Sequence, residues 1–238
     1  MSFSEIFSDA LKYPISESNK FLIIGVITLI AGLTSSIANH STNIALLVVL
    51  GIVSVIASFF IMGYGVSVIN STIIGSSDVP ELDFVKNIID GIKAFIINLV
   101  YYIIPILVFV ILMLISGVAV GGNMSGIVAL GIVNLIIAFI VFVIFAILGE
   151  IAIAKFAKTG DLVSSLMIND IFSEVKEIGF LKILGFIIIQ AIIIFFMVIV
   201  MSFISFIPFI GTLVASFIIG SYLVFFTNRS LGLFYANN

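Results

Sequence analysis

The sequence contains no cysteine and no tryptophan, and His40 is its one histidine. Without cysteine, the chain has no disulfide, no thiolate metal site and no cysteine nucleophile. A single histidine excludes a multi-histidine metal site. The remaining residues form neither a nucleophile–base pair nor a metal-ligand set that we can identify. We therefore expect a non-enzymatic protein that carries no cofactor.

Charged residues are also scarce, at 9% of 238 residues, whereas 63% are hydrophobic. Soluble domains carry about a quarter charged residues, and a water-soluble chain of this length could not hide so much apolar surface. Lipid is therefore the expected solvent for most of the chain. The net charge of -3 is small, and it gives no electrostatic footprint for nucleic acid.

Six apolar runs predict membrane-spanning helices, which need about 20 residues to cross the hydrocarbon core. The expected spans are Phe21–Ala38, Ile44–Ile69, Ala94–Val120, Ile127–Leu148, Ile183–Phe206 and Thr212–Phe226. The last run is short, and it extends to about Leu233 if Arg229 reaches the lipid headgroups. A re-entrant segment is the alternative interpretation of this run.

The charged residues predict how the chain is oriented. Every Lys, Arg, Asp and Glu lies before the first span, between spans two and three, between spans four and five, or after the sixth. Lys and Arg favour the cytoplasmic side of a membrane. We therefore expect a multi-pass protein of the plasma membrane, with both termini in the cytoplasm and three short hairpins turned outward.

A charged segment with an apolar stripe at helical spacing precedes each pair of spans. The three segments are Phe3–Lys12, Leu82–Phe95 and Leu162–Ile178. Such amphipathic helices lie in the membrane interface, with the apolar face toward lipid. Glycines also recur with spacings of eleven or twelve residues, at Gly63 and Gly75, Gly149 and Gly160, and Gly220 and Gly232.

These regularities predict the architecture. We expect one all-α integral membrane domain over residues 1–238, built from three hairpins in parallel orientation, each preceded by a cytoplasmic amphipathic helix. The expected repeats are residues 1–69, 70–149 and 150–238. Between the first two repeats, Gly75–Asp78 should break the helix. Asp78 and Glu81 should cap the next helix, with Pro80 in its first turn.

The same stretch carries a resemblance to a known family. Gly63-Tyr64, Thr72-Ile73 with Gly75, Pro80-Glu81, and Asp90-Gly91 with Lys93 resemble the core signature of domain-of-unknown-function family 4013. Tyr101, Tyr102 and Pro105 continue the resemblance, which covers about Gly63–Pro105. The family comprises archaeal and bacterial multi-pass membrane proteins. The resemblance implies a membrane location and supplies no activity.

Two groups of residues are candidate sites. The family-motif candidates are Gly63, Tyr64, Gly75, Pro80, Glu81, Asp90, Gly91 and Lys93. Gly63 and Tyr64 either contact a ligand or mark a helix exit with an interfacial tyrosine. The acidic and basic residues, with Pro80 and Gly91, either dock a cytoplasmic partner or serve as helix caps, a solvated face and a close-packing glycine. The second group consists of polar residues that could line a vestibule: Asn98, Tyr101, Tyr102, Glu150, Gln190 and Arg229.

For the second group, the alternative to a vestibule is ordinary packing. The polar side chains would then hydrogen-bond neighbouring helices, and Glu150 would be an interface acid paired with Lys155 or Arg229. Intramembrane acids are nevertheless functional candidates by default. Glu150 follows a long uncharged run, so it is the acid expected to lie deepest.

The sequence supports two hypotheses of function. The first is a non-enzymatic protein that binds membrane lipids, or a membrane or cytoplasmic protein partner, through its cytoplasmic-face helices. The second is a transporter or channel for an uncharged or lipidic small molecule, which internal repeats favour. No charged residue lies at the midplane of a span, so no ion or proton relay is evident.

Overall fold

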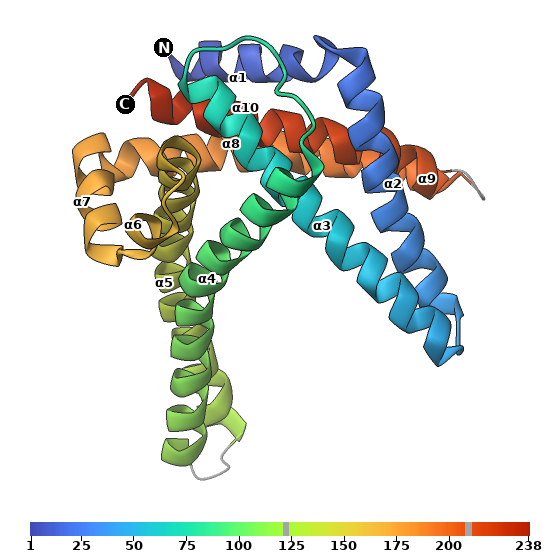
Figure 1. Cartoon of the computed structure of the whole chain (residues 1–238). Helices are drawn as coiled ribbons and strands as arrows, with labels where there is room; N and C mark the ends of the chain where they lie inside the picture. Colours follow the sequence, from blue (N-terminus) through green and yellow to red (C-terminus); the bar gives the residue numbers. More distant parts are fainter. Residues whose placement is uncertain (121–123, 208–210) are drawn as a thin grey trace.

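The structure is a computed structural model, and it describes residues 1–120, 124–207 and 211–238. All secondary structure in these ranges is helical, as the sequence predicts (Figure 1). The long helices are α2 (Ser18–His40), α3 (Ile44–Ile73), α4 (Phe84–Val120), α5 (Met124–Thr159) and α8 (Phe180–Ser205). The shorter elements are α1 (Phe3–Lys12), the 3-10 turn η1 (Tyr13–Ile15), α6 (Leu162–Leu166), α7 (Ile168–Ile178), α9 (Gly211–Ala215), the π-helical turn η2 (Ser216–Gly220) and α10 (Ser221–Ala236).

Several of these helices can cross a membrane. Among the described residues, five helices are long and apolar enough: Ile44–Ile73, Phe84–Gly117, Leu130–Thr159, Phe180–Ser205 and Leu213–Ala236. A sixth candidate joins Phe3–Ile15 to Ser18–Thr34 through a bend of 84°. The structure thus has five or six helices that could span a membrane, which indicates a membrane protein.

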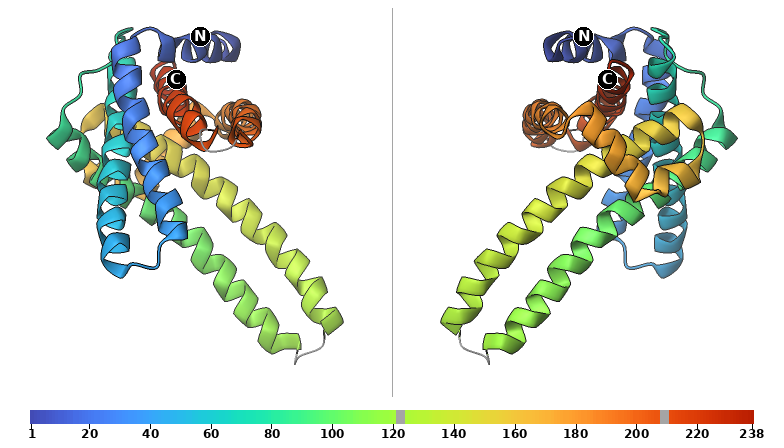
Figure 2. Two further views of the ribbon diagram at one scale, coloured as in Figure 1. Left: turned by 90° about the vertical axis from the view of Figure 1, so that its right-hand side faces the viewer. Right: turned by 90° about the vertical axis from the view of Figure 1, so that its left-hand side faces the viewer.

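The long helices form pairs that diverge from one junction. α2 pairs with α3 and α4 with α5, and both pairs descend in Figure 1, whereas α8 and α10 run across the top. Figure 2 shows α8 and α10 almost end-on. The sequence predicted three hairpins in parallel orientation, but the three pairs point in different directions.

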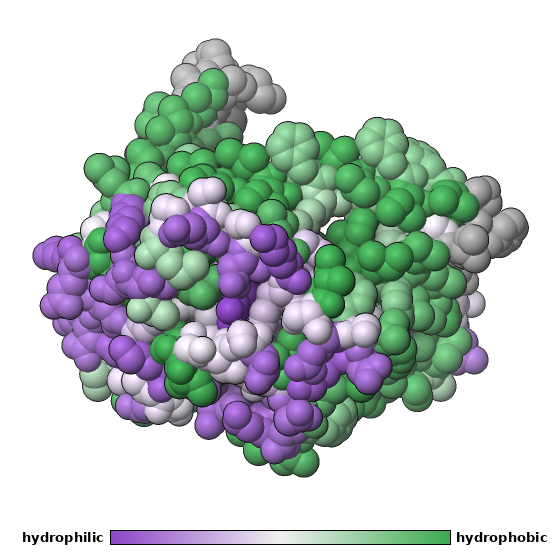
Figure 3. Space-filling model, turned by 90° about the horizontal axis from the view of Figure 1, so that it is seen from above, coloured by the Kyte–Doolittle hydropathy of each residue, from purple (hydrophilic) through white to green (hydrophobic). Residues whose placement is uncertain are grey.

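The charged segments gather at the junction of the pairs. We call this region the polar end, and it comprises α1, the loop 74–83, α6, α7 and the last turns of α10 (Figure 1). Seen from above, polar residues cover one part of this face and apolar residues cover the rest (Figure 3). Beyond the junction, only 11% of the apolar stretch of α3, α4 and α5 is buried. These surfaces are available to lipid.

α3 is the central helix, because it packs against α2, α4, α5 and α10. It crosses α4 where two glycines meet. A Cβ atom on Gly63 would lie 1.7 Å from the Asn87 carbonyl oxygen, and one on Gly91 would lie 1.8 Å from the Phe59 carbonyl oxygen. No larger residue fits at either position without moving a helix backbone. Two residues of the family motif therefore form the contact between α3 and α4.

Aromatic side chains fill the core of the junction. Phe186 stacks on Phe234, with ring centroids 4.3 Å apart, and on Phe7, at 5.4 Å. These contacts join α8, α10 and α1. A second cluster places Tyr64 edge-on to Phe225, at 5.7 Å. Aromatic pairs in such geometries add about 0.5–1.5 kcal/mol beyond the burial of their surface.

α1 lies on protein through its apolar face. Its N-cap is Ser2, whose backbone N–H donates to Glu5 Oε2 at 2.7 Å, and this bond lowers the pKa of the Glu5 carboxyl. Ile6, Phe7 and Ala10 are buried in the core beside α8 and α10. The expected location of this apolar face was lipid. In the structure the face covers the junction of the pairs instead.

The second charged segment also differs from expectation. The sequence predicted a separate helix over Leu82–Phe95, but these residues mostly form the first turns of α4, which continues without a break to Val120. Asp83 Oδ1 accepts the backbone N–H of Lys86 at 3.0 Å, which is an N-cap bond. The predicted cap by Asp78 and Glu81, with Pro80 in the first turn, is therefore wrong.

Two of the recurring glycines end helices. Gly75 and Gly160 follow α3 and α5 with φ angles of +84° and +70°, a conformation that favours glycine. Gly232 lies inside α10, where an added Cβ would come within 2.6 Å of Thr72 Cβ. The second glycine of the third glycine pair, Gly232, therefore packs inside a helix, whereas Gly75 and Gly160 end helices. The threefold repeat over 1–69, 70–149 and 150–238 stays a prediction.

The glycine crossing can be tested with matched variants. Gly63→Ala and Gly91→Ala should each destabilise the protein by about 1–3 kcal/mol, because the new methyl group overlaps a backbone carbonyl. The controls are Gly51→Ala in α3 and Gly117→Ala in α4, where nothing lies within 4 Å of the added Cβ. Unfolding in mixed SDS–dodecylmaltoside micelles, followed by circular dichroism, gives the comparison. Equal stability of all four variants would contradict the close approach of α3 and α4.

Candidate functional site

A hollow of about 530 Å³ lies between the three helix pairs. We call it the junction hollow. α3, α4, α5, α8 and α10 all contribute to its wall. Its polar lining residues are Ser58, Asn98, Glu150, Gln190, Thr227 and Asn228, and the rest of the wall consists of aliphatic residues and Met62. The hollow therefore combines an apolar wall with a few polar groups, as small-molecule sites do.

Glu150 brings a carboxyl group into this wall from α5. The sequence offered Lys155 or Arg229 as its ion-pair partner, and this expectation is wrong. Lys155 Nζ lies 3.5 Å from Glu174 Oε2, and Arg229 Nε lies 2.8 Å from Asp9 Oδ1. Within the described ranges, Glu150 makes neither an ion pair nor a hydrogen bond. It is a carboxyl group without a partner inside an apolar helix.

The side-chain amides of the hollow present acceptor oxygens. Gln190 Nε2 donates to the Thr227 carbonyl at 3.2 Å and to Ser230 Oγ at 2.9 Å. Because a backbone carbonyl can only accept, these bonds fix the orientation of the amide and leave Oε1 without a donor. Asn228 Nδ2 donates to the Val224 carbonyl at 2.7 Å, which likewise leaves Asn228 Oδ1 without a donor. Asn98 makes no hydrogen bond to any described residue.

The other predicted vestibule residues are not part of the lining. The Tyr101 hydroxyl donates to the Ser165 carbonyl at 3.1 Å, so this buried side chain holds α6 against α4. Tyr102 packs on Phe142 of α5, with ring centroids 5.8 Å apart. The hollow thus brings together Asn98, Glu150 and Gln190 but not Tyr101, Tyr102 or Arg229.

Three polar residues of the lining were not predicted from the sequence: Ser58, Thr227 and Asn228. Thr227 and Asn228 immediately precede Arg229, and this run of polar residues at the end of the last span was the available signal. Ser58 gave no signal, because an isolated serine in an apolar helix is common and bonds to its own backbone.

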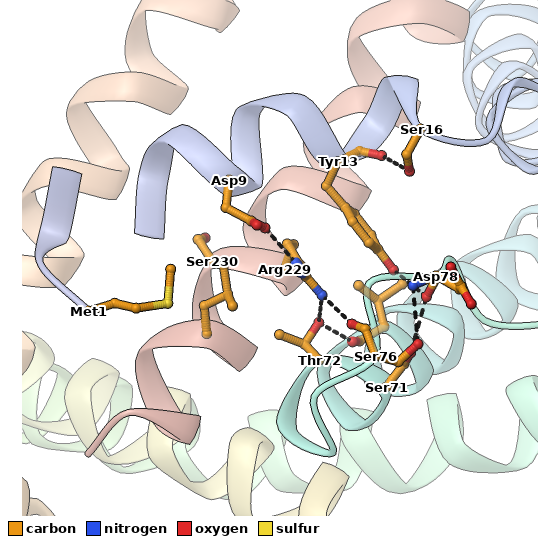
Figure 4. A network of polar contacts seen from close by, with 12 residues as sticks. Met1, Asp9, Tyr13, Ser16, Ser71, Thr72, Ser76, Asp78, Arg229 and Ser230 are labelled. Atoms are coloured by element: carbon orange, nitrogen blue, oxygen red, sulfur yellow. Dashed lines mark hydrogen bonds and ion pairs between the residues drawn. The ribbon is translucent and has the colours of Figure 1, made fainter. Parts of the chain in front are cut away.

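Arg229 organises a second polar cluster at the polar end (Figure 4). From α10, its Nε donates to Asp9 Oδ1 at 2.8 Å and its Nη1 donates to the Ser76 carbonyl at 2.7 Å. Nη1 also lies 3.3 Å from Thr72 Oγ1, and Cζ lies 4.6 Å from the ring centroid of Tyr13. The side chain was expected to reach lipid headgroups, but it is buried. Arg229 therefore ties α10 to α1 and to the end of α3.

The family-motif residues around the loop 74–83 have structural contacts. The Tyr64 hydroxyl donates to the Pro80 carbonyl at 3.3 Å, and Tyr64 is fully buried, so it is not exposed at a membrane interface. Lys20 Nζ lies 3.1 Å from Glu81 Oε1 and donates to the Val79 carbonyl at 2.5 Å. These bonds hold the loop between α3 and α4 against α2.

The last two motif positions lie on α4. Lys93 Nζ is 3.7 Å from Asp90 Oδ1, on either side of the close-packed Gly91. An ion pair of this kind along one helix contributes little to stability, about 0.3–0.5 kcal/mol. The motif thus fixes where the chain leaves α3 and how α4 crosses it. Docking of a cytoplasmic partner to these residues stays a prediction.

The Arg229 cluster predicts an order of stabilities. Arg229→Met should cost about 1–3 kcal/mol, because it leaves the partly buried Ser76 carbonyl and Asp9 without their donor. Asp9→Asn should cost less than about 1 kcal/mol, because Asp9 is partly exposed to solvent. Lys93→Met serves as the control and should stay within about 0.5 kcal/mol of the parent protein. Chemical unfolding in mixed micelles measures all three. A loss for Lys93→Met that equals the loss for Arg229→Met would show that Arg229 is not a structural tie.

Comparisons with known proteins identify a family and nothing beyond it. No curated protein and no solved structure matches the chain. Residues 46–208 match the family described as "Protein of unknown function (DUF4013)", which confirms the resemblance of the motif. The match runs from α3 through α8, so it includes Ser58, Asn98, Glu150 and Gln190 of the junction hollow. Because the match covers more than half of the chain, this chain belongs to the DUF4013 family of proteins of unknown function.

Proposed function

We propose that the protein is a non-enzymatic membrane protein that binds a lipid or another amphiphile in the junction hollow, at its cytoplasmic face. The observation that carries the proposal is the wall of the hollow, which is mostly apolar and includes polar groups from several helices. Its volume of about 530 Å³ falls in the range of about 300–1,000 Å³ typical of small-molecule sites. A molecule with an apolar chain and a polar head matches this lining.

The proposal includes a membrane setting. The five or six apolar helices are placed in the plasma membrane, with the polar end, including α1, α6 and α7, on the cytoplasmic side. The support comes from charge, because every Lys and Arg of the chain lies in or beside the segments of the polar end. α7 buries Ile171 and Val175 against the protein core and exposes Ser173 and Glu177, so its polar face is free to meet water.

The orientation can be tested directly, because the chain lacks cysteine. Ser41→Cys lies in the turn between α2 and α3, and Ser164→Cys lies in α6. In intact cells, a membrane-impermeant maleimide should label Ser41→Cys and should label Ser164→Cys only after the membrane is permeabilised. The reverse pattern would place the polar end outside the cell.

Binding in the hollow can be tested by native mass spectrometry of protein purified in mild detergent from its own membranes. The parent protein should carry a bound amphiphile at a stoichiometric level. Asn98→Phe should remove it, because the ring fills space that the hollow offers. Leu99→Phe is the matched control, since Leu99 is the next residue of α4 and lies exposed on the outside.

The results separate the hypotheses of function. Loss of the amphiphile in Asn98→Phe but not in Leu99→Phe supports binding in the hollow. A stoichiometric protein that copurifies with both variants, with no bound amphiphile, supports a partner-binding role for the cytoplasmic-face helices instead. An amphiphile that stays on Asn98→Phe would place the binding site outside the hollow.

Transport of an uncharged or lipidic molecule is the second candidate function. One observation favours it: the hollow lies between helix pairs, and transporters built from repeats hold their substrates at the interface between repeats. Flux of the copurified amphiphile in proteoliposomes tests it. Parent protein and Leu99→Phe should then accelerate movement between leaflets, and Asn98→Phe should not.

A further inference from the structure

We infer that the junction hollow selects an amphiphile whose head is a primary ammonium group, and that Glu150 binds this head. The inference rests on the proposed function and adds the chemical class of the ligand. Three observations carry it: a carboxyl group without a partner, a surplus of acceptor oxygens around it, and the absence of aromatic and basic side chains from the described wall.

The first observation concerns charge. Glu150 lies within an apolar helix, and the nearby Lys155 and Arg229 are bound to other carboxylates. A carboxylate away from water is costly unless an opposite charge and hydrogen bonds compensate it. No Lys, Arg or His is among the residues that line the hollow. The opposite charge that would stabilise an ionised Glu150 must therefore come from a ligand.

The second observation concerns hydrogen bonds. The amides of Gln190 and Asn228 use their N–H groups on backbone carbonyls, so their oxygens remain as acceptors. Together with the Glu150 carboxylate, they give the hollow a surplus of acceptor oxygens, although the Asn98 amide also brings N–H donors. An ammonium group has three N–H donors and no acceptor, so it complements this set. A carboxylate or phosphate head would instead add acceptors and negative charge.

The third observation excludes other cations. Recognition of a quaternary ammonium relies on aromatic faces, and none of the residues that line the hollow is aromatic. A metal ion needs several anionic or imidazole ligands, and the described residues contain no group of three His, Cys, Asp or Glu that could hold one. Of these cations, a primary ammonium group is the one that the acceptor oxygens and the Glu150 carboxylate of the hollow can bind.

The rest of the wall accommodates an alkyl chain. Ile61, Met62, Ile153, Ile194 and Leu223 come from α3, α5, α8 and α10. Burial of each CH₂ group of a chain contributes about 0.8 kcal/mol. The apolar wall therefore supplies affinity for any amphiphile, and Glu150 with the amide oxygens supplies the preference for its head.

The test compares heads on one alkyl chain. Dodecylamine, dodecyltrimethylammonium and dodecanol are titrated into purified protein in dodecylmaltoside, and native mass spectrometry gives the bound fraction. The parent protein should bind dodecylamine at least about tenfold more tightly than either analogue, as expected for charge-assisted hydrogen bonds. In Glu150→Gln this preference should disappear, while dodecanol binds as before. Glu177→Gln, at an exposed position of α7, should retain the preference.

A second variant covers the case in which Glu150→Gln does not fold. Asn98→Asp adds a carboxylate to the same hollow at a residue that has no hydrogen bond to lose within the described structure. It should strengthen dodecylamine binding relative to dodecanol, and in combination with Glu150→Gln it should restore the preference. If the preference for dodecylamine over dodecanol is the same in the parent protein and in both variants, Glu150 does not bind the head.

The failures of the two proposals can be told apart. Equal binding of all three heads to the parent protein overturns the ammonium inference and leaves the hollow as an amphiphile site. No binding of any head overturns both. Lysophosphatidylethanolamine, compared with lysophosphatidylcholine, then identifies the source of the head. Tighter binding than dodecylamine indicates a phospholipid headgroup, and weaker binding indicates a free alkylamine.

Discussion

The contact between the backbones of α3 and α4 at Gly63 and Gly91 determines the positions of the other elements. Each glycine lies against a carbonyl of the opposite helix, so the two helices meet at one point and diverge beyond it. On another side of α3, Gly65 and Thr72 receive Asn228 and Gly232 of α10. A helix held closely by two neighbours leaves space where those neighbours separate, and the junction hollow occupies that space.

The same contact places the polar groups of the hollow. Asn98 follows Gly91 by seven residues, about two helical turns, so it lies on the side of α4 that faces α3. Asn228 lies against Gly65, and its Oδ1 is held by the bond that Nδ2 makes to its own helix. Glu150 comes from α5, which packs on both α3 and α4. The lining is therefore a consequence of how the helices cross, and it requires no loop.

Much of the fold was predictable from the sequence, because a backbone in lipid must satisfy its hydrogen bonds within a helix. The expected span Ile44–Ile69 corresponds to α3 at Ile44–Ile73, and Ile183–Phe206 corresponds to α8 at Phe180–Ser205. The last span was expected to be short, with a re-entrant segment as the alternative. It is the most buried, at 56% of its apolar stretch, so its polar residues contact protein.

The packing was not predictable in the same way. Lipid tails and protein interiors are both apolar, so a hydrophobic pattern does not say which neighbour a face will meet. For this reason the apolar face of α1 was expected on lipid, and Arg229 was expected at headgroups. Three residues of the hollow, Asn98, Glu150 and Gln190, were recognised as polar residues in apolar spans. The sequence did not show that Glu150 lacks an ion-pair partner, because Lys155 pairs with Glu174 and Arg229 pairs with Asp9 only in the folded structure.

The π-helical turn at Ser216–Gly220 changes the helical register between α9 and α10. The turn itself packs on α2, where Thr28 Oγ1 donates to the Ser216 carbonyl at 3.1 Å, and beyond it α10 packs mainly on α3. Each residue of an α-helix advances the side-chain direction by about 100°. Loss of a single residue from this turn would therefore rotate everything beyond it. Arg229 would point away from Asp9, and Ser230 would point away from Gln190, although neither would have been mutated.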